Sequence, residues 1–370
     1  MPRFLSSLGL AGLLFFAALN PTLVAQGPKD EKDSFELAQR LFEDASYVNA
    51  AQEFRRFILN FPTSEKLPLA IFRLAESHFQ GESHLEAIQV FSDFVDRFPK
   101  HLQVASAKRR KAQSFVRLGE YTKAGAAFQE VHDAFPAGEY AAQDLLSAGY
   151  NYHKGGDLDV GGSAFRRLIN RYPGTPLFPE AVYNLGLVLL QADRHAEALD
   201  QFQTLSEFQE TTERKPDALL QIGELALARQ DLVEAERVFS QLRKNFPKST
   251  STERSYLVSA RWFSAKEDWQ RAAHIYAKAR SALPRNERRQ QAVLGLSDVY
   301  RKMGKNAEAR ALYGEFLKVY PSSPFAPEAW LGLGRAYADL RDFRSALEAF
   351  KRLREEFPSS PTATEALKEM

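Results

Sequence analysis

Histidines and closely spaced acidic residues are the side chains in this sequence most able to do chemistry. The seven histidines are His78, His84, His101, His132, His153, His195 and His274. No two of them have the i, i+4 spacing that places two imidazoles on one helical face to bind zinc. We therefore expect them to be surface or turn residues.

Two short motifs resemble chemical sites but lack an essential part. Residues 161–165 begin like a nucleophile elbow, yet the closing glycine is missing. Asp157 and Asp159 have the alternate spacing of a calcium loop, but the twelfth position, which must hold a glutamate, is Leu168. The sequence therefore predicts a protein that is not an enzyme, with no catalytic residue, no metal site, no cofactor and no small-molecule substrate.

Composition narrows the class of partner. The 370 residues carry a net charge of +2, with acidic and basic residues mixed along the chain, so no broad basic field is present to attract nucleic acid. The densest basic cluster, residues 108–111, is more typical of a solvated helix face than of a binding site. The chain contains no cysteine. This excludes disulfides, thiolate metal sites and lipid attachment through a cysteine within these residues.

The elements that position these side chains follow a period of 37 residues. A small residue recurs at Ala50, Ala87, Ala124, Gly161, Ala198, Ala235, Ala272, Ala309 and Ala346. Four residues later an aromatic ring recurs at Phe54, Phe91, Phe128, Phe165, Phe202, Phe239, Tyr276, Tyr313 and Phe350. Most units close with an aromatic residue or leucine followed by proline. A fixed period of this length indicates an array of stacked repeats.

Each repeat contains two apolar periodic segments separated by a short turn, which predicts a helical hairpin. In the last repeat we expect helices over residues 327–340 and 343–356. Proline recurs at the start of the first helix, where its missing N–H has no intrahelical partner. Glycine occupies some of the turns, as at Gly119, Gly156 and Gly304, whereas other repeats place residues such as Ala45 there.

The small residue followed by an aromatic one, the Leu-Gly and Tyr of the first helix (Leu333, Gly334, Tyr337) and the closing proline resemble the tetratricopeptide repeat. The resemblance covers nine repeats over residues 34–358 and implies an all-α, right-handed α-solenoid. Its long Phe-Pro-x-Ser junctions resemble those of bacterial envelope proteins of this family. These include the BamD-type outer-membrane assembly factor and the periplasmic coordinator of the Tol-Pal system.

The fifth junction, residues 209–215, has lost both the aromatic residue and the proline. The simpler interpretation is drift in one linker, with the second helix running on into Glu210. The alternative is a hinge between repeats one to five and repeats six to nine.

The two ends of the chain differ from the repeats. Arg3 followed by an uncharged stretch and by Leu23-Val24-Ala25 is typical of a signal peptide over residues 1–25, cleaved after Ala25. An uncleaved membrane anchor is the alternative. Residues 26–33 are expected to be a flexible lead-in, and residues 359–370 a C-terminal capping segment.

The resemblance places a row of first-helix residues on the concave side of the array. We predict a partner-binding groove there that contains Phe35, Phe72, Leu146, Tyr150, His153, Tyr183 and Leu187. The alternative is that this row only supports packing between repeats. Tyr150, His153 and Tyr183 are the strongest candidates for anchors, because aromatic residues with a polar tip are enriched at binding hot spots.

These features favour an exported, non-enzymatic scaffold that binds protein or peptide partners in the periplasm or at the outer-membrane periphery. Outer-membrane assembly and Tol-Pal-linked maintenance are the roles that the resemblance suggests. Contact with the membrane would be indirect or through an uncleaved signal anchor. A recognition or regulatory subunit of a peptidoglycan-processing complex is the alternative function.

Overall fold

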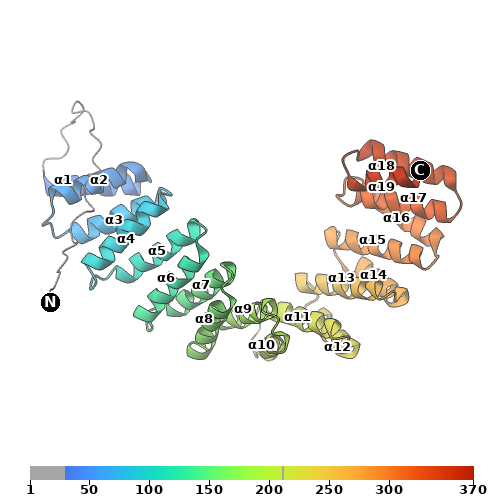
Figure 1. Cartoon of the computed structure of the whole chain (residues 1–370), viewed down its shortest axis with the longest axis horizontal. Helices are drawn as coiled ribbons and strands as arrows, with labels where there is room; N and C mark the ends of the chain where they lie inside the picture. Colours follow the sequence, from blue (N-terminus) through green and yellow to red (C-terminus); the bar gives the residue numbers. More distant parts are fainter. Residues whose placement is uncertain (1–29, 211) are drawn as a thin grey trace, which may run out of the picture. The chain divides into compact units, whose positions relative to one another are not determined.

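The computed structural model describes residues 30–210 and 212–370, and all regular structure in these residues is α-helical (Figure 1). The helices are α1 Glu31–Glu43, α2 Tyr47–Asn60, α3 Leu67–Gln80, α4 His84–Arg97, α5 Val104–Arg117, α6 Tyr121–Ala134, α7 Ala141–Lys154, α8 Leu158–Arg171, α9 Phe178–Gln191, α10 His195–Glu207, α11 Lys215–Ala228, α12 Leu232–Asn245, α13 Thr250–Ala265, α14 Trp269–Ala282, α15 Glu287–Lys302, α16 Asn306–Val319, α17 Ala326–Asp339, α18 Phe343–Glu356 and α19 Pro361–Glu369. The expected all-α array of helical repeats is confirmed. The signal peptide predicted for residues 1–25 lies outside the described residues.

The chain forms two compact units, one ending at Asp144 and the other beginning at Leu145. The uniform period had predicted one continuous array. The division into two units coincides with a local change in sequence. At this point α7 carries Asp144, whereas most repeats carry alanine at the same position. The Asp144 carboxylate is buried and accepts a hydrogen bond of 2.8 Å from Nε of Arg109 on α5. A buried ion pair therefore stands where most other repeats make an apolar contact.

Consecutive helices form hairpins, in which we call the odd-numbered helices α1 to α17 the A helices and the even-numbered ones the B helices. In each hairpin one turn residue has a positive φ. These are Gly119, Gly156 and Gly304 at 74–89°, and Ala45, Glu82, Asp193, Gln230, Glu267 and Arg341 at 56–61°. Glycine is thus helpful but not required, because a single residue tolerates this conformation when the helices on both sides fix it.

The helix ends agree with the expected signals in most repeats. α18 has the predicted bounds and α17 begins one residue earlier than expected. The aromatic residue before the closing proline leaves the helical conformation, as Phe61 does at φ −128° and ψ 58°. α1 begins at Glu31, before the expected start near Ser34, because the side chain of Asp30 caps the amides of the first turn.

The fifth junction differs in one respect from the simpler interpretation, because the predicted extension of the helix was wrong. α10 ends at Glu207 and does not run on into Glu210. Phe208 adopts an extended conformation, at φ −54° and ψ 130°, and its ring stacks on Phe178 of α9 with 5.4 Å between centroids. The stacking contact replaces the usual aromatic-proline closure and ends the helix early.

The core follows the two rows found in the sequence. Each of the nine aromatic residues is 6 % exposed or less, and the small residues four positions earlier are buried with them. Small side chains let antiparallel helices approach to within about 8–10 Å, and the ring then fills the space beside them. Each hairpin therefore acquires its hydrophobic interior from its neighbours.

The aromatic ring packs against a glycine in two different ways. In four hairpins it lies on a glycine of its own A helix, as Phe239 does on Gly223, where an added Cβ would come within 2.2 Å of the ring. In the seventh and eighth hairpins the ring is Tyr276 or Tyr313. It lies on a glycine of the following A helix, and a Cβ at Gly295 would come within 2.4 Å of Tyr276. In these six hairpins the ring thus lies on the helix that carries the facing glycine.

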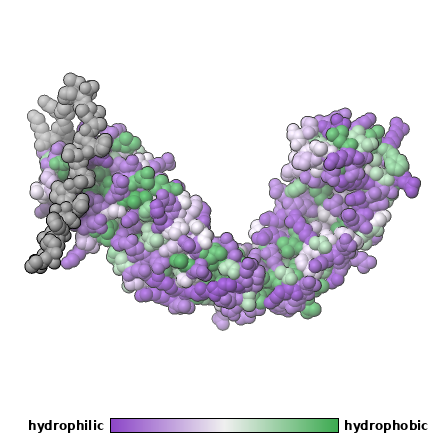
Figure 2. All heavy atoms as spheres, in the orientation of Figure 1, coloured by the Kyte–Doolittle hydropathy of each residue, from purple (hydrophilic) through white to green (hydrophobic). Residues whose placement is uncertain are grey.

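Hydrophilic residues cover most of the coloured surface on the face shown in Figure 2, and hydrophobic residues lie between them. Among residues 30–210 and 212–370, every helix is too short or too polar to span a lipid bilayer.

Candidate partner-binding site

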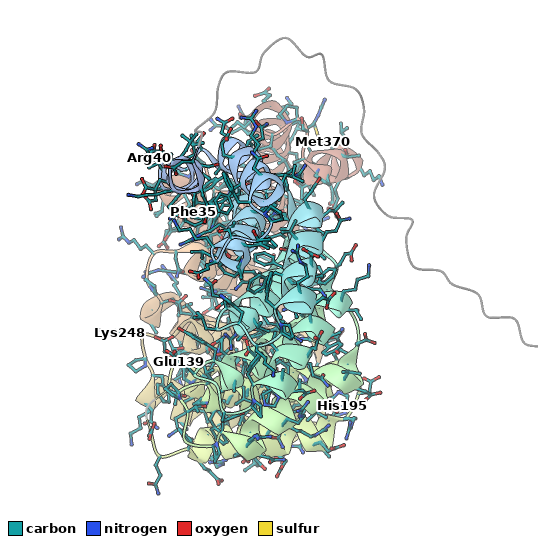
Figure 3. All side chains as sticks on the ribbon, turned by 90° about the vertical axis from the view of Figure 1, so that its left-hand side faces the viewer. Phe35, Arg40, Glu139, His195, Lys248 and Met370 are labelled. Carbon is teal, nitrogen blue, oxygen red and sulfur yellow. The ribbon has the colours of Figure 1, made fainter. Side chains whose placement is uncertain are left out.

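The structure separates the predicted groove residues into two groups. Phe35 on α1 (Figure 3), Phe72 and Leu146 are 8 %, 6 % and 5 % exposed, respectively, and belong to the hydrophobic core. At these three positions the row supports packing between helices, as the alternative interpretation stated.

The other predicted residues lie near the surface of α7 and α9. Tyr150 is 37 % exposed, whereas His153, Tyr183 and Leu187 are half-buried. Nε2 of His153 lies 2.7 Å from Oε1 of Gln191, which links the ends of these two A helices. Their role in binding stays a prediction.

Tyr150 is part of a polar cluster at the start of α9. Its hydroxyl donates a hydrogen bond to the carboxylate of Glu180 and accepts one of 3.0 Å from Nδ2 of Asn184. Asn184 also donates to Oε1 of Glu180 at 2.9 Å. Glu180 is the third residue of α9, where the positive end of the helix dipole favours a carboxylate. The helix thus positions the acceptor that orients the tyrosine.

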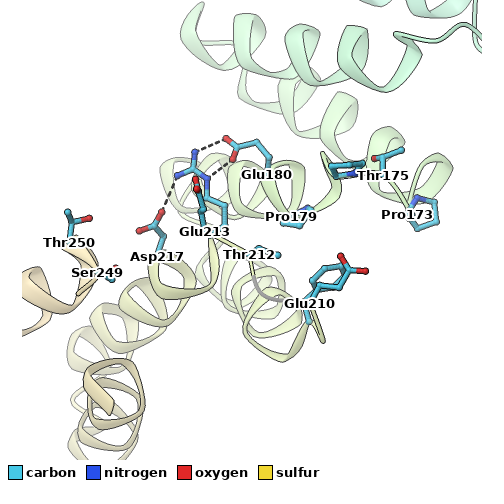
Figure 4. Close-up of a pocket in the computed structure, with 14 residues that line it drawn as sticks. Pro173, Thr175, Pro179, Glu180, Glu210, Thr212, Glu213, Asp217, Ser249 and Thr250 are labelled. Carbon is cyan, nitrogen blue, oxygen red and sulfur yellow. Dashed lines mark hydrogen bonds and ion pairs between the residues drawn. The ribbon is translucent and has the colours of Figure 1, made fainter. Parts of the chain in front are cut away.

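Arg214 extends the cluster to α11. It donates through Nε and Nη2 to both oxygens of Glu180 and through Nη1 to Asp217, at 3.1 Å (Figure 4). The guanidinium also lies over the ring of Tyr183, 5.0 Å from its centroid. Ser251 on α13 donates to the second oxygen of Asp217. Four successive A helices are therefore joined by one network of charged and hydroxyl groups, which we call the tyrosine–arginine cluster (Tyr150, Glu180, Tyr183, Asn184, Arg214, Asp217 and Ser251).

A groove of about 620 Å³ lies beside this cluster, as shown in Figure 4. Its walls include the loop after α8, with Pro173 and Pro176, and Phe208 after α10. The groove opens at the fifth junction, where the closing aromatic-proline pair is missing. The irregular repeat thus leaves space at the edge of the A helices.

The protonation equilibria of the cluster are shifted away from neutral pH. Burial and the neighbouring Glu180 raise the pKa of Tyr150 to about 12. Burial alone would raise the pKa of Glu180, but hydrogen bonds from Arg214, Tyr150 and Asn184 hold it below its ordinary value. The hydrogen bond to Glu180 raises the pKa of Arg214. These shifts favour a neutral Tyr150 hydroxyl, an ionised Glu180 and a protonated Arg214 at neutral pH.

No group of three or more histidine, aspartate or glutamate side chains that could hold a metal ion occurs in the described part of the chain.

Several members of the cluster were not predicted as site residues. The sequence patterns did not single out Glu180, Asn184, Arg214 or Asp217. The recurrence of an acidic residue after the helix-starting proline could have identified the two carboxylates. Arg214 gives no periodic signal, because it lies in the junction that breaks the pattern.

Two segments match models of the tetratricopeptide-repeat family, residues 69–101 and residues 294–361. The helical hairpins within these two segments are therefore tetratricopeptide repeats. Residues 105–249 match the model of the YfiO family, which is described as an outer membrane lipoprotein. The middle of the chain is thus similar to that family. None of the curated proteins matches the chain.

Solved structures with a similar chain path include tetratricopeptide-repeat proteins. One from Parabacteroides merdae is 20 % identical, with a TM-score of 0.45, over 72 % of this chain and 98 % of its own. MamA from Desulfovibrio magneticus is 19 % identical, with a TM-score of 0.37, over 49 % of this chain and 96 % of its own. The tetratricopeptide domain of P58(IPK) is 14 % identical, with a TM-score of 0.32, over 92 % and 97 %.

Proposed function

We propose that this protein is an exported, non-enzymatic scaffold of the bacterial cell envelope that binds protein partners through the A-helix surface around the tyrosine–arginine cluster. One observation carries the proposal: from Tyr150 to Asp217 the cluster lies within residues 105–249, the part similar to the outer membrane lipoprotein family YfiO. A role in outer-membrane assembly or in Tol-Pal-linked maintenance is the specific function that this similarity favours.

The chemistry of the cluster supports binding. Tyrosine and arginine are enriched at interface hot spots, because they combine a large apolar surface with hydrogen-bonding groups. Here the rings of Tyr150 and Tyr183 are held by neighbouring side chains, so they lose little conformational freedom when a partner binds. Arg214 is fixed by two carboxylates and orients the ring of Tyr183.

The test is co-purification of the full chain from envelope extract. We expect Tyr150→Ser combined with Tyr183→Ser to reduce recovery of the bound partner at least about tenfold, because two hot-spot side chains are each worth about 2 kcal/mol or more. Val160→Ser combined with Val233→Ser is the matched control, since both valines are exposed on B helices. This control should retain the partner.

Full recovery with the tyrosine double variant, in a chain whose helical content is unchanged, would contradict the binding site. Location in the cytoplasm, established by cell fractionation, would contradict the envelope assignment. If the partners that depend on these tyrosines are cell-wall hydrolases or synthases, the recognition-subunit function is correct instead.

A further inference from the structure

The contact between each B helix and the following A helix is formed at a recurring position. The following A helices carry a buried residue there, which is alanine at Ala70, Ala107, Ala181, Ala218, Ala292, Ala329 and Ala366. The last of these belongs to α19. Only two described helices that follow a B helix depart from alanine: α7 carries Asp144 and α13 carries Ser255. Both of these residues are buried as well, at 1 % and 0 % exposure.

The substitution on α13 belongs to a polar stripe at the sixth junction, between α12 and α13. Ser251, Thr252, Ser255 and Ser259 are all buried on α13. At the position of Ser259 the preceding A helices α9 and α11 carry Leu185 and Ile222, which are buried in the core. The α13 side of the junction has therefore exchanged apolar contacts for hydroxyl groups.

Arg243 on α12 fills the space facing this stripe. Nε donates to Oγ of Ser255 at 3.2 Å, and Nη2 donates to the carbonyl oxygen of Ser255 at 3.3 Å and to Oγ of Ser259 at 3.1 Å. The guanidinium lies 4.2 Å from the centroid of the Tyr256 ring and 4.0 Å from the carboxylate of Glu236. A largely buried cation is thus held mainly by neutral groups, and burial lowers the pKa of Arg243.

The helices at this junction also pack differently from those elsewhere in the second unit. Among the helices that precede it, α13 packs more on α11 than on α12, whereas α11, α15 and α17 pack more on the B helix before them than on the preceding A helix. One cluster of buried residues extends from Leu145 to Leu242 and another begins at Leu257, and only the partly buried Leu232 and Trp262 pack against both. No helix contributes fully buried residues to both, although the cores on either side of α15 and α17 share these helices.

From these observations we propose that the sixth junction is a hinge, at which repeats seven to nine move as one rigid body relative to repeats four to six. The hinge does not depend on which partner the protein binds. Opening an apolar contact exposes surface that water solvates poorly, whereas a guanidinium and hydroxyl groups regain hydrogen bonds to water when they separate. The polar junction is therefore the least costly place to open.

The first departure from alanine provides an independent comparison. Asp144 occupies the corresponding position on α7, and the chain divides into its two compact units directly after this residue. The fifth junction, by contrast, keeps Ala218 at this position, and the core continues through it from Leu205 to Leu219. The polar residue at this position, and not the missing proline, thus coincides with the boundary between the two compact units.

The absence of cysteine allows a direct test on the full chain by paired spin labels. Asp159, Val233 and Ala307 are exposed and occupy equivalent positions two repeats apart on B helices. The pair Val233→Cys and Ala307→Cys spans the sixth junction. The pair Asp159→Cys and Val233→Cys has the same separation in sequence and does not span it, so it serves as the matched control.

We expect the distance distribution across the sixth junction to be broader than that of the control. Arg243→Ile, Ser255→Ala and Ser259→Leu together recreate the residues Ile169, Ala181 and Leu185 of the fourth junction, and should narrow the distribution to the width of the control. Equal widths in the unmodified sequence would overturn the proposal. So would a distribution that stays broad in the triple variant while circular dichroism shows unchanged helical content.

Discussion

Repeats four to six and repeats seven and eight use the same sequence signal to build different contacts. In repeats four to six the aromatic ring of the B helix lies on a glycine of its own A helix, as Phe202 does on Gly186. In repeats seven and eight Tyr276 and Tyr313 lie on the next A helix. The first arrangement strengthens the hairpin, and the second joins neighbouring hairpins. The aromatic period alone therefore does not determine which contact is formed.

The same two regions each contain a tyrosine bonded to a carboxylate, with opposite consequences for the carboxylate. Tyr150 donates to Glu180, which Arg214 also binds, and the pKa of Glu180 is lowered. Tyr313 donates a hydrogen bond to Asp298. Burial of Asp298 raises the pKa of its carboxyl despite the tyrosine and the nearby Arg301. At Glu180 the hydrogen bonds outweigh the effect of burial on the pKa, whereas at Asp298 burial outweighs the nearby charges and the tyrosine.

Removing the aromatic rings should have the largest effect on the stability of these two regions. Phe239→Ala and Tyr276→Ala should each lower the free energy of unfolding locally by about 3–5 kcal/mol, because a cavity remains. Phe239→Ala should weaken protection from hydrogen exchange around repeats five to seven, most strongly within its own hairpin of α11 and α12. Tyr276→Ala should weaken protection in both α14 and α15, since the ring joins two hairpins.

Hydrogen exchange measured residue by residue distinguishes these patterns. Unchanged protection around Phe239 in the first variant would contradict its role in the core. Loss of protection confined to α13 and α14 in the second would contradict the assignment of Tyr276 to the next hairpin.

A smaller effect is expected from filling the space at the glycines. Gly223→Ala and Gly295→Ala place a Cβ within 2.2 Å and 2.4 Å of the facing ring, so the ring must move. Overpacking of this kind costs about 1–3 kcal/mol. Gly314→Ala is the matched control, because nothing lies within 4 Å of its added Cβ and it should leave the denaturation midpoint unchanged or slightly raised. Equal midpoints for all three variants would show that the glycines do not position the rings.

The sequence predicted those features that repeat with the period. The two buried rows, the hairpin turns at residues such as Ala45 and the bounds of α18 are local patterns, so each repeat confirms the others. The division after Asp144 was missed, because one substitution in a regular row gives no periodic signal. The effect of Asp144 on the fold depends on its packing against the neighbouring helix, which the sequence does not show.

The candidate site was predicted only in part for a geometric reason. Phe35, Phe72 and Leu146 are buried, whereas Tyr150 and Leu187 lie in a row four residues further along each A helix. Four residues are about 40° more than one helical turn, so a small error in the direction of the face moves a residue from the surface into the core. Arg214 was missed because its partners, Glu180 and Asp217, are on two helices and are brought together only by the fold.

The two carboxylates should give opposite dependences of stability on acid. Because the pKa of Glu180 is lowered, its contribution is present above the ordinary value of 4.5 and is lost as the pH falls through the lowered pKa. Because the pKa of Asp298 is raised, its contribution is present below the ordinary value of 3.8 and is lost as the pH rises through the raised pKa. With rising pH the unmodified protein should therefore gain stability relative to Glu180→Gln and lose it relative to Asp298→Asn. Chemical denaturation from pH 3 to pH 7 measures both differences, and slopes of the same sign would contradict the comparison.

The smallest effect is expected from removing single hydroxyl groups. Tyr150→Phe leaves Glu180 bonded to Arg214 and Asn184, so it should cost about 0.5–1.5 kcal/mol, the net value of one hydrogen bond. Tyr313→Phe removes the hydroxyl donor of Asp298 and should lower the free energy of unfolding by more, because the buried carboxylate then loses a hydrogen-bond partner. Since the pKa of Tyr150 is raised to about 12, the advantage of tyrosine over phenylalanine is complete below pH 10 and disappears as the pH rises towards 12. Thermal unfolding of each variant at pH 7, and of Tyr150→Phe also at alkaline pH, tests this order. A larger loss for Tyr150→Phe than for Tyr313→Phe would show that Arg214 does not stabilise Glu180 on its own.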